Sequence, residues 1–98
     1  MALTEKQKRH LRGLAHQRKP VVIVGGAGLT DNVMVEIENG IAHHELLKVR
    51  INADSRSARR DMIEQICAQT NSELVQAIGH TASFYRPAEK PVISLPKG

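Results

Sequence analysis

A short apolar run leads directly into a glycine-rich loop, and this junction constrains the fold more than any other part of the chain. Residues 21–24 are continuously apolar, which is typical of a strand covered on at least one face. The loop Gly-Gly-Ala-Gly follows at residues 25–28. Thr30 then fits the N-cap of a helix that has Asp31 in its first turn. The pattern predicts a strand, a tight loop and a helix, which together begin a β-α-β unit.

The segment before this junction predicts a basic, amphipathic helix. Thr4 and Gln7 have the spacing of a capping box, and the helix is expected to end near His16. At 100° per residue, one face collects Leu3, Gln7, Leu11, Leu14 and Ala15. Basic side chains flank that face, and Pro20 ends the connection to the strand.

The second helix and the strand after it predict packing against a sheet. The helix has a buried stripe at Val33, Met34, Ile37 and Ile41. Gly40 inside it costs about 1 kcal/mol relative to alanine, which indicates a close approach to the sheet. Apolar residues then alternate with basic ones over residues 47–51, as in a half-buried strand with one wet, basic face.

The last third of the chain predicts a helix, a hairpin and a tail. Asp54 or Ser55 caps the third helix, whose core positions are Met62, Ile63, Ile66 and Thr70. Residues 74–78 and 81–86 predict a hairpin around Gly79 and His80. Residues 87–98 contain three prolines and form a tail whose order the pattern leaves open.

These elements predict one α/β domain over residues 1–98, with the order α-β-α-β-α-β-β and a mixed four-stranded sheet. Right-handed crossovers place the second and third helices on the same face if the strands are added in one direction. The alternation at residues 47–51 favours a two-layer α/β sandwich whose opposite face is open. A chain of 98 residues has room for one modest core.

Positive charge is concentrated at the amino terminus. The formal net charge is +4, yet six cations and a single carboxylate fall within residues 1–20: Lys6, Lys8, Arg9, Arg12, Arg18 and Lys19 against Glu5. Such a segment fits an electrostatic footprint on a polyanion, and equally a solvated helix that aids solubility. The chain has one Phe, one Tyr and no Trp, so modules that stack bases on exposed rings are disfavoured. A nucleic acid would be bound mainly through its backbone and shape.

The glycine loop permits two interpretations. Without side chains, residues 25–28 can bring backbone N–H groups at the positive end of a helix up to a phosphate. A G-x-x-G loop is also often only a tight turn. The loop lacks the further residues of a dinucleotide fingerprint or a P-loop, so mononucleotide binding is not indicated.

Nothing in the sequence indicates catalysis or a metal. His43, His44 and Glu45 are consecutive on a helix and point in different directions, so they lack the spacing of metal ligands. Cys67 lies beside core positions without an orienting partner, as an inert buried thiol would. The single cysteine suits a reducing cytoplasm, and no apolar run reaches the length of a signal core or a membrane span. We therefore expect a cytoplasmic protein with no enzymatic activity, cofactor, small-molecule substrate or membrane association.

The combined motifs resemble the CRM domain (chloroplast RNA splicing and ribosome maturation) in its stand-alone bacterial, YhbY-type form. The resemblance is carried by Pro20…Val24-Gly25-x-x-Gly28-Leu29-Thr30…Val33…Glu36-Ile37…His44-Glu45-Leu46…Lys48-Val49, by Lys6-Gln7…Leu11-Arg12…Leu14-Ala15-His16 and by Phe84-Tyr85-Arg86-Pro87. It implies an RNA-binding α/β domain similar to the C-terminal domain of bacterial translation initiation factor three. Bacterial members are associated with precursors of the large ribosomal subunit, and plant relatives act in group II intron splicing.

The resemblance also implies which residues bind RNA. The family's G-x-x-G loop corresponds to Gly25 and Gly28, and its basic surface to the first helix. Members often carry a basic or polar residue inside the loop, whereas Gly26 and Ala27 offer none. Backbone N–H groups and neighbours such as Lys19 would then supply the attraction.

The leading hypothesis is a non-enzymatic protein that binds ribosomal RNA and assists large-subunit assembly. The expected contacts are Lys6, Lys8, Arg9, Arg12, Arg18, Lys19, Gly25, Gly26, Ala27 and Gly28, extended by Lys48 and Arg50 if these two face the same side. The hypothesis requires the loop and the amino-terminal cations to share one surface. The alternatives are a ribosome-associated factor that binds only protein, and a small enzyme dependent on His44 or Cys67. The RNA site, its sequence specificity, the assembly step and the oligomeric state are not encoded in recognisable form.

Overall fold

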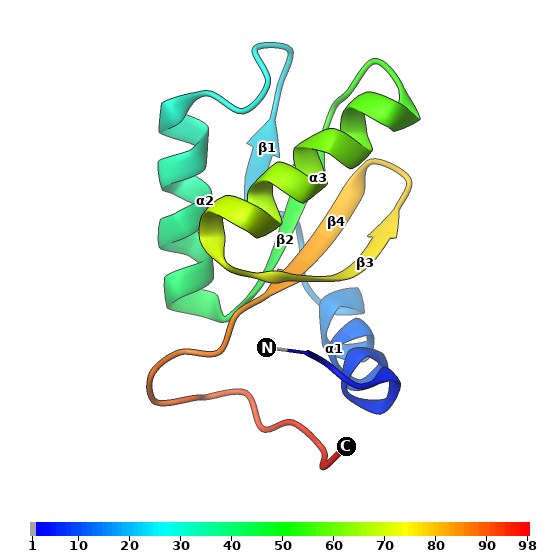
Figure 1. The fold of residues 1–98 in the computed structure, drawn as a ribbon, viewed down its shortest axis with the longest axis vertical. Helices are drawn as coiled ribbons and strands as arrows, with labels where there is room; N and C mark the ends of the chain where they lie inside the picture. Colours follow the sequence, from blue (N-terminus) through cyan, green and yellow to red (C-terminus); the bar gives the residue numbers. More distant parts are fainter. Residues whose placement is uncertain (1) are drawn as a thin grey trace.

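The computed structural model describes residues 2–98 as three helices and four strands (Figure 1). In chain order these are α1 (Glu5–His16), β1 (Val22–Val24), α2 (Asp31–His44), β2 (Leu46–Ile51), α3 (Arg56–Thr70), β3 (Glu73–Ile78) and β4 (Thr81–Tyr85). The predicted element order is confirmed. So are the helix starts: Thr4 and Gln7 form the capping box of α1, Thr30 caps α2, and Ser55 rather than Asp54 caps α3.

The strands form one mixed sheet in the order β1-β2-β4-β3. β1 runs parallel to β2, and β4 is antiparallel to both β2 and β3. The last strand is therefore inserted between β2 and β3, instead of being added at an edge. Helices α2 and α3 lie on the same face of the sheet, as right-handed crossovers predict (Figure 1).

The main core lies between the sheet and the α2–α3 layer. Ile37 and Ile41 of α2 and Ile66 of α3 are fully buried against Leu47 and other strand residues. Gly40 faces the sheet so closely that a Cβ built on it would lie 2.9 Å from Cδ1 of Leu47. The close approach expected at Gly40 is therefore present, and its missing side chain makes room for Leu47.

The opposite face of the sheet is covered at one end, which differs from the open face expected from the sequence. Leu46 extends the alternating strand by one residue and pairs in register with Tyr85. These side chains pack against Leu11 and Ala15 of α1, and Val75 completes this second cluster. The apolar stripe of α1 is thus buried on the sheet, and only the part of the face beyond it is uncovered.

The C-terminal tail is packed along the same end of the molecule as α1. Ile93 and Leu95 contact the second cluster, and Nε2 of Gln7 donates a hydrogen bond to the carbonyl oxygen of Pro96 at 3.1 Å. Glu45 is only 2% exposed, and its carboxylate accepts hydrogen bonds from the backbone N–H groups of Ala88, Val92 and Ile93. These contacts order a segment for which the sequence predicted no element. Within residues 2–98, none of the helices has the length and apolarity needed to cross a bilayer.

Candidate nucleic-acid interface

The glycine loop and α1 lie at opposite ends of the longest axis of the molecule, which extends 39 Å (Figure 1). The two are separated because β1 runs away from α1, and the loop follows only at the far end of this strand. The loop and the amino-terminal cations, which the hypothesis requires to share one surface, are therefore not adjacent. A single ligand can contact both only if it spans the molecule.

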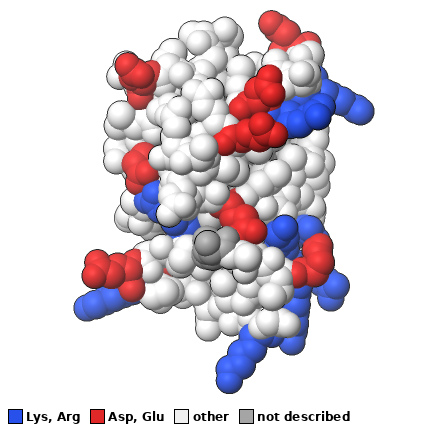
Figure 2. All heavy atoms as spheres, viewed as in Figure 1, with Lys and Arg blue, Asp and Glu red and all other residues white. Residues whose placement is uncertain are grey.

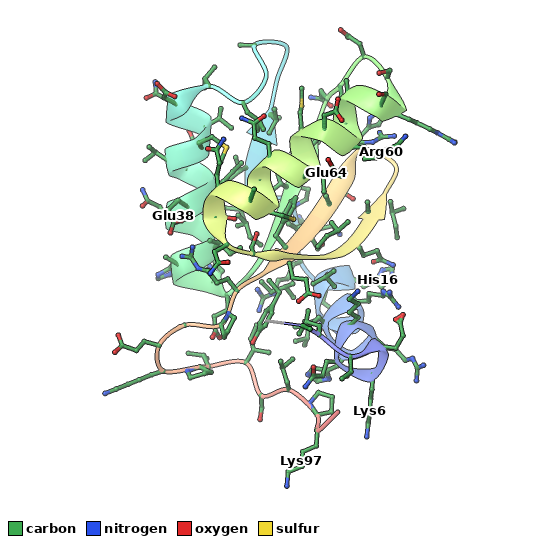
Figure 3. All side chains as sticks on the ribbon, viewed as in Figure 1. Lys6, His16, Glu38, Arg60, Glu64 and Lys97 are labelled. Carbon is green, nitrogen blue, oxygen red and sulfur yellow. The ribbon has the colours of Figure 1, made fainter. Side chains whose placement is uncertain are left out.

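The cations of α1 differ in their exposure and in their contacts with other residues. Lys6 and Arg9 are exposed, and Lys6 projects from the same end of the molecule as Lys97 (Figure 3). Lys8 is half-buried. Arg12 is also half-buried: its Nε lies 3.4 Å from the carbonyl oxygen of Val75 and its Nη2 lies 3.6 Å from Oε1 of Glu5. Exposed lysine and arginine side chains gather at this lower end in Figure 2.

Two of the predicted cations secure the C-terminal end of α1. The Nη1 atom of Arg18 donates to the carbonyl oxygen of Leu46 at 2.6 Å. The Nζ atom of Lys48 donates to the carbonyl oxygens of Ala15 and Arg18, both at 3.3 Å. A cation beside the last carbonyls of a helix is favourable. Arg18 and Lys48 therefore have structural partners, whereas Lys19 is exposed.

Beyond α1, the uncovered part of the sheet presents two rows of side chains. Strand register aligns Lys48 with Ser83 and Ser83 with Gln76 in one row. The next row is Ile23, Arg50, Thr81 and Ile78. Because residues 48 and 50 alternate with the buried residues 47, 49 and 51, Lys48 and Arg50 do face the same side. Together they lead from the end of α1 toward the strand ends where the glycine loop begins.

The glycine loop is a closed turn at its base and exposed at its tip. The N–H of Gly28 donates to the carbonyl oxygen of Gly25 at 3.0 Å, and Gly28 has φ +73°, a conformation that side chains disfavour. Gly26 and Ala27 are exposed. Thr30 uses its side-chain oxygen to cap α2 by accepting from the N–H of Val33. The amide group of Gly28 is thus used internally, and the exposed tip of the turn is at Gly26 and Ala27.

A second group of cations, which the sequence reasoning missed, lies at the end of the molecule that holds the loop. It consists of Arg56, Arg59 and Arg60 in the first turns of α3. Nη1 of Arg59 lies 3.5 Å from Nδ1 of His80 in the β3–β4 turn. Arg60 projects outward near this end, and Figure 2 shows blue side chains there beside red ones (Figures 2 and 3). The sequence did contain the signal, but Asp54, Asp61 and Glu64 cancel these three charges in a sum over residues 54–64.

The residues considered for catalysis or metal binding differ in their exposure and surroundings. Among residues 2–98 no three His, Cys, Asp or Glu side chains gather as metal ligands would. His43 and His44 are exposed at the end of α2, whereas Glu45 is buried against the tail. Burial raises the pKa of the half-buried Cys67 thiol, despite opposing hydrogen bonds from Ser72 and Leu74. A raised pKa disfavours the thiolate that nucleophilic chemistry requires.

Comparison with known proteins agrees with the family suggested by the motifs. The family model of the CRS1 / YhbY (CRM) domain matches residues 3–86 of the chain. That range includes α1, the glycine loop, the whole sheet and α3. The tail that packs on Glu45, residues 87–98, lies outside it.

Similar proteins match over nearly their full length. A Haemophilus influenzae protein named "RNA-binding protein" is 46% identical over 97% of this chain and 96% of its own. A Bacillus subtilis protein named as a probable RNA-binding protein is 37% identical over 96% of this chain and 99% of its own. The solution structure of a hypothetical Staphylococcus aureus protein has a TM-score of 0.83, 36% identity, and coverage of 97% of this chain and all of the other.

Proposed function

The chain belongs to the CRS1 / YhbY (CRM) domain family, and we propose that it is a non-enzymatic RNA-binding protein. The RNA would follow an elongated path across the molecule instead of entering one compact site. It would run from α1, over Lys48 and Arg50, to the glycine loop and the first turns of α3. The names of the bacterial relatives support the choice of RNA as the ligand.

The uncovered face of the sheet is the observation that carries this proposal. Its two rows contain Lys48 and Arg50 but no carboxylate. Glu73 is the single carboxylate of the four strands. It lies at the end covered by α1, where both its oxygens are within hydrogen-bonding distance of the N–H of Leu3. A phosphate backbone therefore meets cations along the middle of the path without a repelling charge.

We further propose that the ligand is ribosomal RNA in precursors of the large subunit and that the protein assists assembly in the cytoplasm. This finer statement is supported by the family resemblance, because bacterial members of stand-alone length are associated with such precursors. The exposed cations would contact the phosphates of an RNA strand and respond to its shape, without selecting one particular base. This mode of binding fits RNA that is still folding.

The direct test measures binding of the purified chain to protein-free large-subunit ribosomal RNA at two salt concentrations. We expect affinity to fall steeply with salt, because each neutralised phosphate releases counterions. Arg9→Glu, an exposed change on α1, is expected to lower the affinity by about tenfold or more and to flatten the salt dependence. Lys90→Glu is the matched control, since it makes the same charge change on the exposed tail.

The same experiment separates the proposal from its competitors. Absence of binding to protein-free RNA, combined with binding to assembly particles, would favour a factor that recognises ribosomal proteins. Equal affinities of the two variants would remove α1 from the path. Sequencing the RNA cross-linked to the chain in cells then identifies the site.

A further inference from the structure

We propose that the uncovered face of the sheet also holds one unstacked RNA base, in a small groove beside the end of α1. This inference rests on the proposed function and deepens it, because it adds contact with a base to contact with the backbone. The groove has a volume of about 160 Å³ and is lined by His16, Lys48, Gln76, Ile78, Thr81 and Ser83. It lies across the middle of the proposed RNA path.

Ser83 is the observation that points to a ligand. This residue is only 3% exposed, yet it lines the groove. Within the part of the chain that the structure describes, its hydroxyl has no hydrogen bond to another residue. Since no fully enclosed side-chain N or O atom there lacks a partner, this hydroxyl is not fully enclosed. Because this hydroxyl is accessible from the groove and can both donate and accept, it offers a polar contact to a molecule that enters there.

Gln76 extends this polar edge. Strand register places it directly beside Ser83, and its amide provides both a donor and an acceptor. Lys48, on the other side of Ser83, has its ammonium bound to the carbonyl oxygens of Ala15 in α1 and Arg18 just after it, and so forms a fixed wall. The row therefore offers a donor and acceptor pattern of the kind that the edge of a base recognises.

An apolar side chain beside that row suits the flat face of a base. Ile78 is 54% exposed although it lies in a strand, and the neighbouring row continues with Thr81, Arg50 and the 60% exposed Ile23. A guanidinium plane such as that of Arg50 can stack on a base. Phe84 and Tyr85 are both buried, so among the aromatic rings only that of His16 lines the groove, where it offers a second flat surface to a base.

The size and surroundings of the groove restrict the ligand. Pockets for complete small molecules usually have volumes of about 300–1,000 Å³, and this groove is much smaller. The cations around it continue along the sheet, as a strand carrying several phosphates would require. One base of a single-stranded segment fits both facts, and paired bases would remain inaccessible.

The experiment compares two single strands of about ten nucleotides, a length that one small domain can cover. One has a mixed sequence with all four bases, and the other is an abasic ribose-phosphate strand of equal length. The double variant Gln76→Ala/Ser83→Ala is compared with Gln65→Ala/Ser94→Ala, which changes the same residue types at exposed positions. Thermal unfolding verifies that both variants are folded.

We expect the unmodified chain to bind the base-bearing strand about tenfold more tightly than the abasic strand. The groove variant should lose this preference while keeping its affinity for the abasic strand, and the control should retain both. Equal binding of both strands by the unmodified chain, or a preference that survives in the groove variant, overturns the inference. Displacement of the strand by free nucleoside monophosphates at comparable concentration would also overturn it, because the groove would then serve a mononucleotide. Failure to bind either strand would contradict the proposed function itself.

Discussion

One carboxylate oxygen of Glu45 accepts a hydrogen bond of 2.8 Å from the backbone N–H of Ile93, 48 positions later in the chain. Glu45 joins α2 to β2 in a conformation with φ +63°, and its side chain points into the curve of the tail. The N–H groups of Val92 and Ala88 donate to the same carboxylate at 2.9 and 2.8 Å. The buried Glu45 side chain therefore accepts three hydrogen bonds that hold the start of the tail, while Ile93 and Leu95 add apolar contacts.

Glu45→Gln is expected to destabilise the fold by about 1–3 kcal/mol. Glutamine keeps the shape but replaces one accepting oxygen with a donor, which would face an N–H group, and it removes the charge. Urea unfolding measures the change, with the exposed Glu89→Gln as control. A Glu45→Gln midpoint equal to that of the control would show that the hydrogen bonds of this carboxylate contribute nothing to stability.

Acid should weaken the fold through two carboxylates. Burial raises the pKa of Glu45, but hydrogen bonds from Ala88, Ile93 and Val92 and the charge of Arg18 outweigh it and leave the pKa below the ordinary value of 4.5. The pKa of Glu38 is also lowered, chiefly by its hydrogen bond from Arg86, which burial only partly opposes.

A folded-state pKa below the unfolded value means that the charged form stabilises the fold above about pH 4.5, and that this stability is lost as the pH falls through the lowered pKa. Urea midpoints measured from neutral to acidic pH should therefore decline below about pH 4.5. In Glu45→Gln the decline should be shallower, because one of the two carboxylates no longer titrates. An unchanged slope in this variant would contradict the assignment.

The helices and the sheet were predictable because their signals are local. Capping at Thr4 and Thr30 is encoded within four residues, and the alternation over residues 47–51 reports a strand with one buried face. Gly40 is a similar case, since a glycine inside a helix indicates a close neighbour. The hairpin around Gly79 and His80 also follows from adjacent residues.

The arrangement of the site was not predictable in the same way, because it depends on contacts between distant segments. The separation of α1 from the glycine loop follows from the direction of β1. Leu46 is buried because α1 packs against this end of the sheet. Glu45 is an acceptor only because the tail passes it. The position of Arg56, Arg59 and Arg60 near the loop could be recognised only from the fold, because it depends on α3 beginning at that end of the molecule.

Two glycines of the loop should respond differently to the same small substitution. Gly28 has φ +73°, so Gly28→Ala is expected to cost about 1–2 kcal/mol of stability. A Cβ on Gly26 would have no heavy atom within 4 Å, so Gly26→Ala should leave the unfolding midpoint nearly unchanged. Chemical unfolding of both variants checks this, and equal destabilisation would contradict the turn geometry.

Charge placed at the exposed tip of the loop should change RNA affinity without changing the fold. Gly26 has room for a side chain and offers no charge of its own. Gly26→Lys is expected to strengthen binding to large-subunit ribosomal RNA and to steepen its salt dependence. Gly26→Glu is expected to lower the affinity and to make the salt dependence shallower. Gly26→Ala provides the reference. Equal affinities of the three variants would show that the loop does not contact the RNA, and this conclusion holds whether or not α1 binds RNA.

The arginines at the start of α3 should contribute to the far end of the RNA path. Arg56 and Arg60 are exposed and have no carboxylate within ion-pair distance among residues 2–98, so Arg56→Glu/Arg60→Glu should not unfold the chain. Each lost phosphate contact on a single strand lowers the slope of log affinity against log salt by about 0.7. A filter-binding titration at several salt concentrations is expected to show a reduced slope and a lower affinity for the double variant, whereas Lys90→Glu keeps both. An unchanged slope would end the path at Arg50, before the start of α3.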